Sequence, residues 1–464
     1  MARALPLFAA IILLGPVAAA SVSAESELAL DQALSLARKS SEAIRLSNLA
    51  LEKSKAALGE AQAKALPHVD LEASASYLVN PPPGYTVAAG ALGSIPIPPT
   101  YTTTLPIPPN NFNVGAALHN YVSLTASLKQ PLFTWGKIKN AIDLASLQVD
   151  AAGTDVSARQ KDIELQVRKS YFSALLARKS QEALKRMRDT AAGMAADRQK
   201  AFDQGTMNRE SLLEAKSTLA SLEARLVEAG QSESTALENL RVLTGVDAGS
   251  MELATDFRSS LPPLDEQELL AKALEGSPDM TAARTRIEQA RRKLSVEEGG
   301  AILHPDVNLG ISLDIAGQED FPYSGAWTFS NNTWNVDLLL TLGITMSAFD
   351  GMESFHRIQE AEKDSDMAGV AFSQQAKIVR IQVRQTVEAA VKADADAQAG
   401  GARAEYLQEK LRNTGVALAN GQASQEDQRG AAIQADAAEL DLLLALYTRE
   451  SALADLQKLT GAQP

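Results

Sequence analysis

The side chains that most often carry catalysis or bind metals are sparse in this 464-residue sequence. It contains no cysteine, and its nine methionines are not grouped. Its four histidines are His68, His119, His304 and His356. They are scattered, and no HExxH, P-loop or GxSxG motif is present. We therefore expect neither an enzyme nor a protein with a bound metal or cofactor.

The N-terminal segment is typical of a secretory signal peptide. One positive residue precedes an apolar run that is too short for a membrane-spanning helix. Val22 and Ala24 then occupy the −3 and −1 positions of a cleavage site. We expect cleavage after Ala24 and a mature protein outside the cytoplasm.

Composition excludes several classes of protein. The net charge of −13 and the lack of any Lys/Arg block argue against a nucleic-acid partner. Without cysteine, no disulfide can stabilise the exported chain. After the signal peptide, no run of about eighteen apolar residues predicts a transmembrane helix. The mature chain is therefore either a soluble periplasmic protein or one that enters a membrane as strands.

The sequence contains an internal duplication. Three pairs of matching positions are separated by the same interval along the chain, and they are Phe133 and Phe349, Gly205 and Gly421, and Gly245 and Gly461. An identical interval for all three pairs, without a gap between them, indicates a repeat. The predicted organisation is a signal peptide (1–24), a first repeat (25–245), a linker (246–264) and a second repeat (265–464).

Each repeat has the same predicted order of helix, strand, loop, strand, long helix, glycine turn and helix. At 1.5 Å per residue the long helices approach ~100 Å. A first helix and a returning helix placed end to end would match one long helix, so we expect a slab of four rods. Gly400 and Gly401 weaken the second long helix, where a kink or break would be no surprise. The predicted helices are 28–66, 137–204 and 208–244, then 266–303, 352–420 and 425–460.

Two alternating stretches in each repeat predict strands. In "WNVDLLLTLGITM", residues 334–346, every second residue is apolar, so one face of this strand is apolar. The other strands are 69–77, 122–129 and 307–315. Soluble strands average about five or six residues, whereas a tilted strand crosses a bilayer in about 9–11. The column predicted to face lipid is Trp334, Val336, Leu338, Leu340, Leu342 and Ile344.

The alternative is a half-buried sheet in a soluble domain. That sheet would need other parts of the chain to cover four apolar strand faces. The helices on either side are expected to pack against one another, so none is left to cover the strands.

Residues 80–117 hold a Pro-rich segment, predicted to be a long exposed loop of undetermined function. Four strands cannot close a barrel, and lipid tolerates no open sheet edge. Two copies give eight strands and three give twelve, and the pattern alone leaves the number open.

The duplicated order, "QPLFTWGK" after the second strand, the turn at Gly421 and the two LTG closures resemble the TolC family of outer-membrane efflux proteins. The resemblance covers nearly all of the mature chain. It implies a mainly α-helical homotrimer with membrane β-strands. A twelve-stranded barrel would lie in outer-membrane lipid, and a long helical tunnel would project into the periplasm. The implied partners are a periplasmic adaptor and an inner-membrane pump.

The resemblance also implies functional positions. Gly205 and Gly421 match the helix-turn tips that close the tunnel and meet the adaptor. Asp427 matches a carboxylate that lines the constriction, where three copies would form a cation-attracting ring. Departures from the family pattern are Ser347 and Met352 in place of Pro131 and Gly136, Ser211 opposite Asp427, and Gly430. They leave open how the closed tip is held.

The function implied is a passive outer-membrane efflux duct that performs no chemistry. The alternative is a soluble periplasmic coiled-coil scaffold or adaptor whose strands form a small sheet. The cargo, whether drug, metal ion or polypeptide, and the identity of the pump and adaptor cannot be derived from the sequence.

Overall fold

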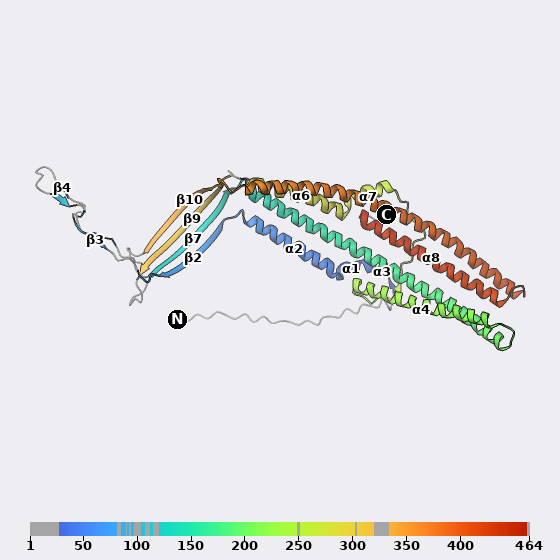
Figure 1. The fold of residues 1–464 in the computed structure, drawn as a ribbon. Coiled ribbons are helices and arrows are strands. Elements are labelled where there is room, and N and C mark those ends of the chain that lie inside the picture. The colour runs from blue at the N-terminus through green and yellow to red at the C-terminus, as the bar shows by residue number, and fades with distance from the viewer. Residues whose placement is uncertain are drawn as a thin grey trace. The chain divides into compact units, whose positions relative to one another are not determined.

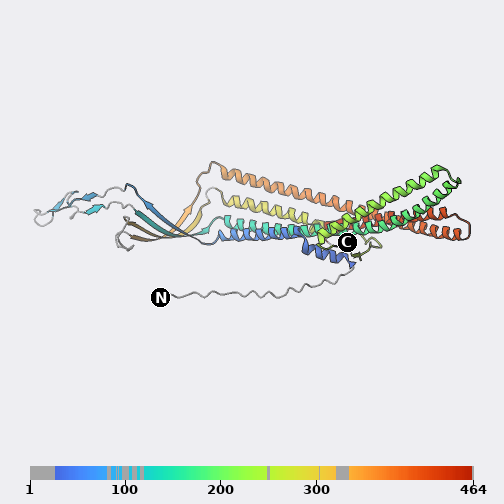
Figure 2. The same ribbon diagram turned by 90° about the horizontal axis from the view of Figure 1, so that it is seen from below.

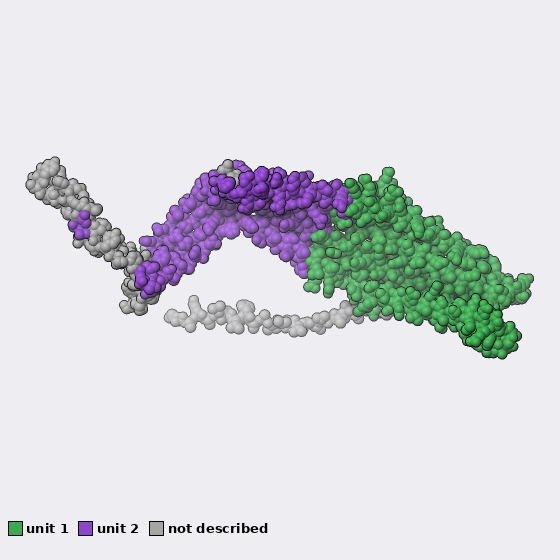
Figure 3. Space-filling view, in the orientation of Figure 1, with its two compact units in different colours: residues 1–47, 155–280, 376–464 green, residues 48–154, 281–375 purple. Residues whose placement is uncertain are grey.

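The structure is a computed structural model, whose elements are labelled in Figure 1 and seen from below in Figure 2. It describes residues 27–80, 85–89, 91, 94–96, 104–106, 112–114, 120–247, 251–301, 304–319 and 334–461. The predicted signal peptide and its cleavage site lie outside these residues. The chain divides into two compact units (Figure 3). Unit 1 comprises residues 1–47, 155–280 and 376–464, and unit 2 comprises residues 48–154 and 281–375.

The helices come in pairs of equal length. The 11-residue pair is α1 (Leu30–Ser40) and α5 (Glu266–Gly276), and the 22-residue pair is α2 (Glu42–Ala63) and α6 (Pro278–Gly299). The 67-residue pair is α3 (Lys137–Asp203) and α7 (Glu353–Ala419), and the 36-residue pair is α4 (Arg209–Thr244) and α8 (Gln425–Thr460). The long and returning helices agree closely with the predicted ranges. None of the described helices has an apolar stretch long enough to cross a membrane.

The first helix of each repeat was predicted to be continuous, and this is wrong in both repeats. Ser41 and Ser277 adopt extended backbone conformations and end α1 and α5. Each serine hydroxyl then accepts a hydrogen bond from the backbone N–H three residues on, which caps the following helix. Pro278 adds to the second break because proline disfavours the helical conformation at the preceding residue.

The helix α7 continues through Gly400 and Gly401 without a break. A Cβ atom at Gly400 would lie 3.3 Å from the Cα atom of Leu442 in α8. Gly400 therefore permits a close approach of the two helix backbones. The packing gained there offsets the low helix propensity of glycine.

Two left-handed residues lead into each long helix. Trp135 and Gly136 have φ angles of 50° and 82°, and Gly351 and Met352 have 71° and 74°. Met352 thus adopts the conformation of the glycine it replaces, at a cost of about 1–2 kcal/mol. The Trp135 turn is fixed in place, since its indole N–H donates to the Pro305 carbonyl at 3.0 Å.

In unit 1 the four long helices follow the order α4, α3, α8, α7 (Figure 1). Leu184 and Met187 of α3 pack against Leu222 of α4, and Ile433 of α8 packs against the same cluster. On the other side of α8, Ala435 and Ala438 pack with Ala404 and Leu407 of α7. The small alanine side chains allow neighbouring helices to approach closely.

Ion pairs run along the α3–α8 contact in antiparallel order. They are Asp162–Lys458 at 2.6 Å, Lys169–Asp455 at 2.7 Å, Arg186–Asp436 at 2.8 Å, Asp197–Arg429 at 2.7 Å and Arg198–Glu426. Each partly exposed pair contributes at most about 1 kcal/mol. Because a one-residue slip would separate all of them, together they specify the register of α3 against α8.

The largest core of unit 1 lies where α1, α3 and α4 meet a short parallel ladder of β1 (Glu27–Leu28) and β8 (Glu252–Leu253). Tyr171 of α3 is fully buried in it. Its hydroxyl donates to the Leu28 carbonyl and accepts from the Thr255 N–H, both at 2.8 Å. One side chain therefore ties α3 to β1 and to the residues that follow β8.

Unit 2 contains an antiparallel sheet of four strands in the order β10-β9-β7-β2 (Figure 1). They are β2 (His68–Tyr77), β7 (Asn120–Phe133), β9 (Asp306–Glu319) and β10 (Trp334–Thr345). All four predicted strands are therefore present. Two faces alternate along each strand, as the sequence pattern required.

The Pro-rich segment was predicted to be a long exposed loop, and some of its residues form two short ladders of edge strands. β3 (Tyr85–Val87) pairs with β6 (Phe112–Val114), and β4 (Ser94–Pro96) pairs with β5 (Thr104–Pro106). Proline is compatible with these ladders because both strands of a two-stranded ladder are edge strands.

In unit 2, α6 contacts the first part of α3 and the first part of α7. Asn140 of α3 donates to the Ser295 carbonyl of α6 at 3.1 Å. Lys293 of α6 forms an ion pair with Asp364 of α7 at 2.6 Å. In this unit α6 bonds to both long helices, the role that α8 has in unit 1.

The position of Tyr171 predicts a stability defect that depends on a single oxygen atom. We expect Tyr171→Phe to lower the free energy of unfolding by about 1–3 kcal/mol, because the Thr255 amide loses its partner inside the core and the Leu28 carbonyl keeps only the bond from the Ala254 N–H. Thermal unfolding of the purified protein, followed by circular dichroism, measures this. The control is Tyr406→Phe on the exposed surface of α7. Equal effects of the two substitutions would contradict the proposed role.

Candidate functional site

One face of the four-stranded sheet is apolar across all four strands. The register aligns three apolar rows, which are Val69–Leu128–Ile311–Leu340, Leu71–Ala126–Leu313–Leu338 and Ala73–Leu124–Ile315–Val336. In β10 the column from Val336 to Ile344 has side chains that are 62–75% exposed. Trp334 is the first residue of this strand. The column from Val336 to Ile344 thus belongs to a continuous apolar surface that no described part of the chain covers.

The opposite face of the sheet is polar and carries a row of carboxylates. Glu72, Thr125, Asp314 and Asp337 lie side by side in the register of the four strands. Asp314 accepts hydrogen bonds from Thr125 at 2.7 Å and from Ser312 at 3.0 Å. Like charges directly opposite one another, as at Asp314 and Asp337, are unfavourable in a ladder. This face therefore needs contact with water.

A hollow lies on the same polar face, nearer the helical end of the strands. Asp70, Lys129 and Thr341 are among the residues that line it. Lys129 and Asp70 are 3.7 Å apart and mostly exposed. The side chain of Thr341 is thus on the face opposite to that of Leu340, as strand alternation requires.

Both edges of this sheet are unpaired among the described residues. β10 and β2 each pair on one side only. They are 12 and 10 residues long. Long unprotected edges present free N–H and C=O groups that readily pair with another chain.

Tight turns join α3 to α4 and α7 to α8 (Figure 2), and the predicted tips, Gly205 and Gly421, lie in these turns. Their φ angles of 72° and 73° are in the left-handed region that favours glycine. Side chains of Asn208 and Ser424 then accept hydrogen bonds from backbone N–H groups at the starts of α4 and α8. These glycines therefore have a structural role in both turns.

Asp427, the predicted constriction residue, is exposed and takes part in a capping box. Its carboxylate accepts hydrogen bonds from the Ser424 backbone at 2.9 Å and the Ser424 hydroxyl at 2.7 Å. These bonds, the hydroxyl bond first, lower the pKa of Asp427, so it carries its charge at neutral pH. Ser211 occupies the matching position at the start of α4, where its N–H is capped by Asn208.

Ion pairs near the tips join the two repeats, and sequence reasoning did not find them. Arg198 of α3 bonds to Glu214 of α4 at 3.0 Å and to Glu426 of α8. Arg429 of α8 bonds to Asp197 of α3 at 2.7 Å. The hydrogen bond to Glu426 is the main reason that the pKa of Arg198 is raised. Charge spacing within one repeat gives no signal for partners that lie in the other repeat.

The described part of the chain brings no three His, Asp or Glu side chains close enough to hold a metal ion. The rings of His68 and His304 each contact a backbone carbonyl nearby in the chain, at 3.0 and 3.1 Å. His119 lies outside the described residues. The described histidines are not brought together into a site.

Comparisons with known proteins add two curated relatives. The cobalt-zinc-cadmium resistance protein CzcC of Cupriavidus metallidurans is 26% identical over 201 residues, which cover 43% of this chain and 48% of that protein. The alkaline protease secretion protein AprF of Pseudomonas aeruginosa is 27% identical over 285 residues, which cover 58% of this chain and 55% of that protein. The chain spans about half the length of the curated relatives it matches.

A solved structure shares the fold over almost the full chain. The CmeC outer membrane channel of Campylobacter jejuni superimposes with a TM-score of 0.72 at 18% identity, covering 93% of this chain and 85% of that one. The family model for outer membrane efflux proteins matches residues 33–246 and again residues 269–462. These two matches cover most of the sequence, and the chain belongs to the outer membrane efflux protein family.

Proposed function

We propose that this chain is the outer-membrane channel of a tripartite efflux system. It would form a passive duct for substrates delivered by a periplasmic adaptor and an inner-membrane pump. The observation that carries the proposal is the sheet, with one uncovered apolar face, one polar face and two edges that are unpaired among the described residues. Family membership and the channel fold support it. The proposed boundaries are a signal peptide at 1–24, repeats at 25–245 and 265–464, and a linker between them.

The geometry of the edges supports assembly with copies of the same chain. The sheet ends in β2 and β10, and the row of long helices in unit 1 ends in α4 and α7. Joining one edge to the opposite edge of the next copy is a heterologous contact, which closes into a ring. Three copies give a barrel of twelve strands with a lumen, whereas eight strands would be filled by side chains. We therefore propose a homotrimer.

In this assembly the apolar rows face lipid and the carboxylate row faces the lumen. Glu72, Asp314 and Asp337 from each of three copies would form an acidic band that attracts cations. Asp427 would add a second acidic ring at the tip. The ion pairs of Arg198 and Arg429 would hold the two hairpins of each chain together in the closed state.

The names of the relatives do not fix the cargo. One is named for resistance to cobalt, zinc and cadmium, and the other for secretion of an alkaline protease. Because these two relatives are named for such different cargoes, we propose that the channel itself does not select the substrate. The pump and the adaptor would select it. The soluble scaffold alternative has no observation that favours it, since it leaves the apolar face uncovered.

The mass of the extracted protein tests the proposal. Outer membranes washed with urea are extracted with detergent, and the particle is measured by light scattering with detergent mass subtracted. We expect a particle of three chains, found only in the detergent extract. A monomer or dimer released by urea into the soluble fraction would show that the strands never met lipid.

Neighbouring residues of β10 test which face meets lipid. Leu340→Arg is expected to cost about 2–4 kcal/mol near the bilayer midplane and to reduce trimer yield in membranes. Thr341→Arg adds the same charge on the polar face, so we expect normal assembly and altered conductance. Heat-modifiable gel mobility and single-channel recording measure the two effects. Equal tolerance at both positions would reject the face assignment.

The ion pairs at the tips predict a gating effect. Removing Arg198 breaks its bonds to Glu214 and Glu426. A partly exposed ion pair is worth at most about 1 kcal/mol, so we expect Arg198→Ala to raise the population of open channels by up to about fivefold. Single-channel conductance in planar bilayers measures this.

The matched control is Arg412→Ala, which removes an arginine that pairs with Glu409 one turn away on α7. The Arg198 substitution must raise conductance more than the control does. An unchanged or lower conductance in Arg198→Ala would show that this pair does not restrain the closed tip.

A further inference from the structure

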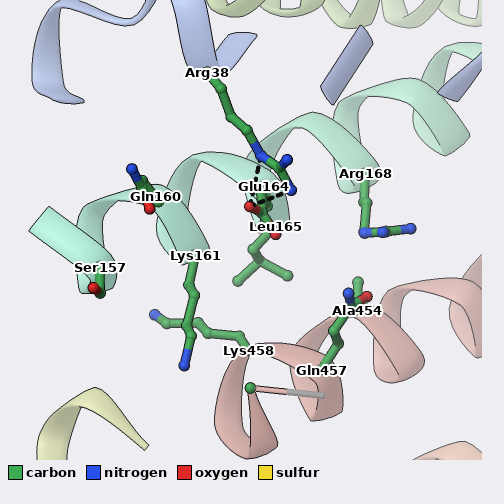
Figure 4. A pocket seen from close by; sticks show the side chains of 11 residues that line it. Arg38, Ser157, Gln160, Lys161, Glu164, Leu165, Arg168, Ala454, Gln457 and Lys458 are labelled. Atoms are coloured by element: carbon green, nitrogen blue, oxygen red, sulfur yellow. Dashed lines mark hydrogen bonds and ion pairs between the residues drawn. The ribbon is translucent and has the colours of Figure 1, made fainter. Parts of the chain in front are cut away.

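A basic cavity in unit 1 lies away from the tips. It has a volume of about 410 Å³ and is bounded by α1, α3 and the last turns of α8 (Figure 4). Four cationic side chains line it, and Glu164 is the one acid among its lining residues. The cations are Arg38, Lys161, Arg168 and Lys458. Sequence reasoning did not find this site, because its walls come from segments that are far apart in the chain.

Helical periodicity explains how these residues share one cavity. Lys161, Glu164 and Arg168 recur at three- and four-residue intervals on α3, so they lie on one face. Ala454, Lys458 and Gly461 recur in the same way along the end of α8. At such an interface between helices the facing positions are usually apolar, and here most are charged or polar.

Two of the four cations are neutralised by ion pairs. Arg38 lies 2.7 Å from Glu164, and Lys458 lies 2.6 Å from Asp162. Lys161 and Arg168 form no ion pair with an acid among the described residues. The Lys161 ammonium group donates instead to the Gly276 carbonyl, at 3.4 Å. The residues that line the cavity therefore carry an excess of positive charge, and Glu164, Asp31 and Glu450 attract Arg168 without forming an ion pair with it.

The positive charge of Arg168 is largely buried and is not solvated as a surface arginine would be. Its side chain extends from α3 toward α8 (Figure 4), and the residue is 8% exposed. Its Nε atom is buried without a hydrogen-bond partner in the described part of the chain. Burial is the main reason that its pKa is lowered. A buried guanidinium is costly unless an anion compensates it.

We propose that this cavity binds a small oxyanion with at least two anionic groups, either phosphates or carboxylates. Lys161 and Arg168 are two turns apart on α3, so their attachment points are about 10 Å apart, a span that suits two such groups. Lys and Arg are the usual ligands of phosphate and carboxylate, and Arg binds either through paired N–H groups. The volume accommodates an organic body between them.

A purely structural role for these cations explains only part of the site. The Lys161 ammonium group lies close to Gly276 and Gly461, where α5 and α8 end, and a cation at a helix C-terminus is favourable. That role gives no reason for the burial of Arg168, which has no ion-pair partner among the described residues. The proposal does not depend on the channel function, so each can fail without the other.

Isothermal titration calorimetry on the full-length protein in detergent tests the site, at fixed ionic strength in sodium chloride. The probes are sodium pyrophosphate for the phosphate class and citrate for the carboxylate class. We expect saturable binding of one probe molecule per chain. Because Lys161 lines the cavity and forms no ion pair among the described residues, Lys161→Met is expected to weaken binding about tenfold or more.

The control is Lys200→Met, which removes an exposed cation from the same helix outside the cavity. It must bind as the unmodified protein does. Arg168→Gln is a second variant, and Lys161→Met keeps the test valid if burial of Gln prevents folding. Binding of one probe alone identifies the phosphate or the carboxylate class. Absence of saturable binding for both probes, or equal weakening in Lys161→Met and Lys200→Met, would overturn the proposal.

Discussion

The contact between α3 and α8 is the constraint on which the helical unit depends. Among the described contacts between neighbouring long helices in unit 1, it is the one that joins the two repeats, because α3 with α4 and α7 with α8 are each formed within one repeat. Its apolar part is modest, so the antiparallel series of ion pairs specifies the alignment more than it adds stability. The tip pairs of Arg198 and Arg429 are the last members of this series. The ion pairs that fix the register of the two repeats therefore extend to the helix-turn tips, where a channel would close.

The sheet of unit 2 depends on a different constraint, since its two faces require different surroundings. Rows of Val, Leu and Ile cover one face without a described partner, and three carboxylates share a row on the other. If water surrounded the whole sheet, exposure of the apolar rows would cost free energy, and if lipid surrounded it, the facing carboxylates would. Lipid outside and water inside satisfy both. The same reasoning makes the edges of β2 and β10, which are unpaired among the described residues, a reason for assembly.

Local signals in the sequence were sufficient for the long elements and for the turns. Alternation located all four strands of the sheet, and the LTG glycines and tip glycines marked helix ends that need left-handed backbone. The helix break at Ser41 was missed, and the short edge strands at Pro96 and Pro106 lay within a segment predicted only as a loop, because serine and proline can be interpreted in more than one way locally. Arg198 with Glu426, and the cavity of Lys161 and Arg168, depend on contacts between distant segments. No pattern within one repeat specifies such partners.

The equal lengths of the paired helices limit how the chain can change by insertion or deletion. The starts of α1 and α5, Leu30 and Glu266, are further apart along the chain than the starts of α3 and α7, Lys137 and Glu353. The whole difference lies between the first helices and the long helices, where the strands and their connections are. One residue added within α3 would rotate everything beyond it by about 100° and advance it by about 1.5 Å, against an unchanged α8. Insertions and deletions can accumulate around the strands, whereas a change of length in one helix is tolerated only if the helix packed against it changes length by the same amount.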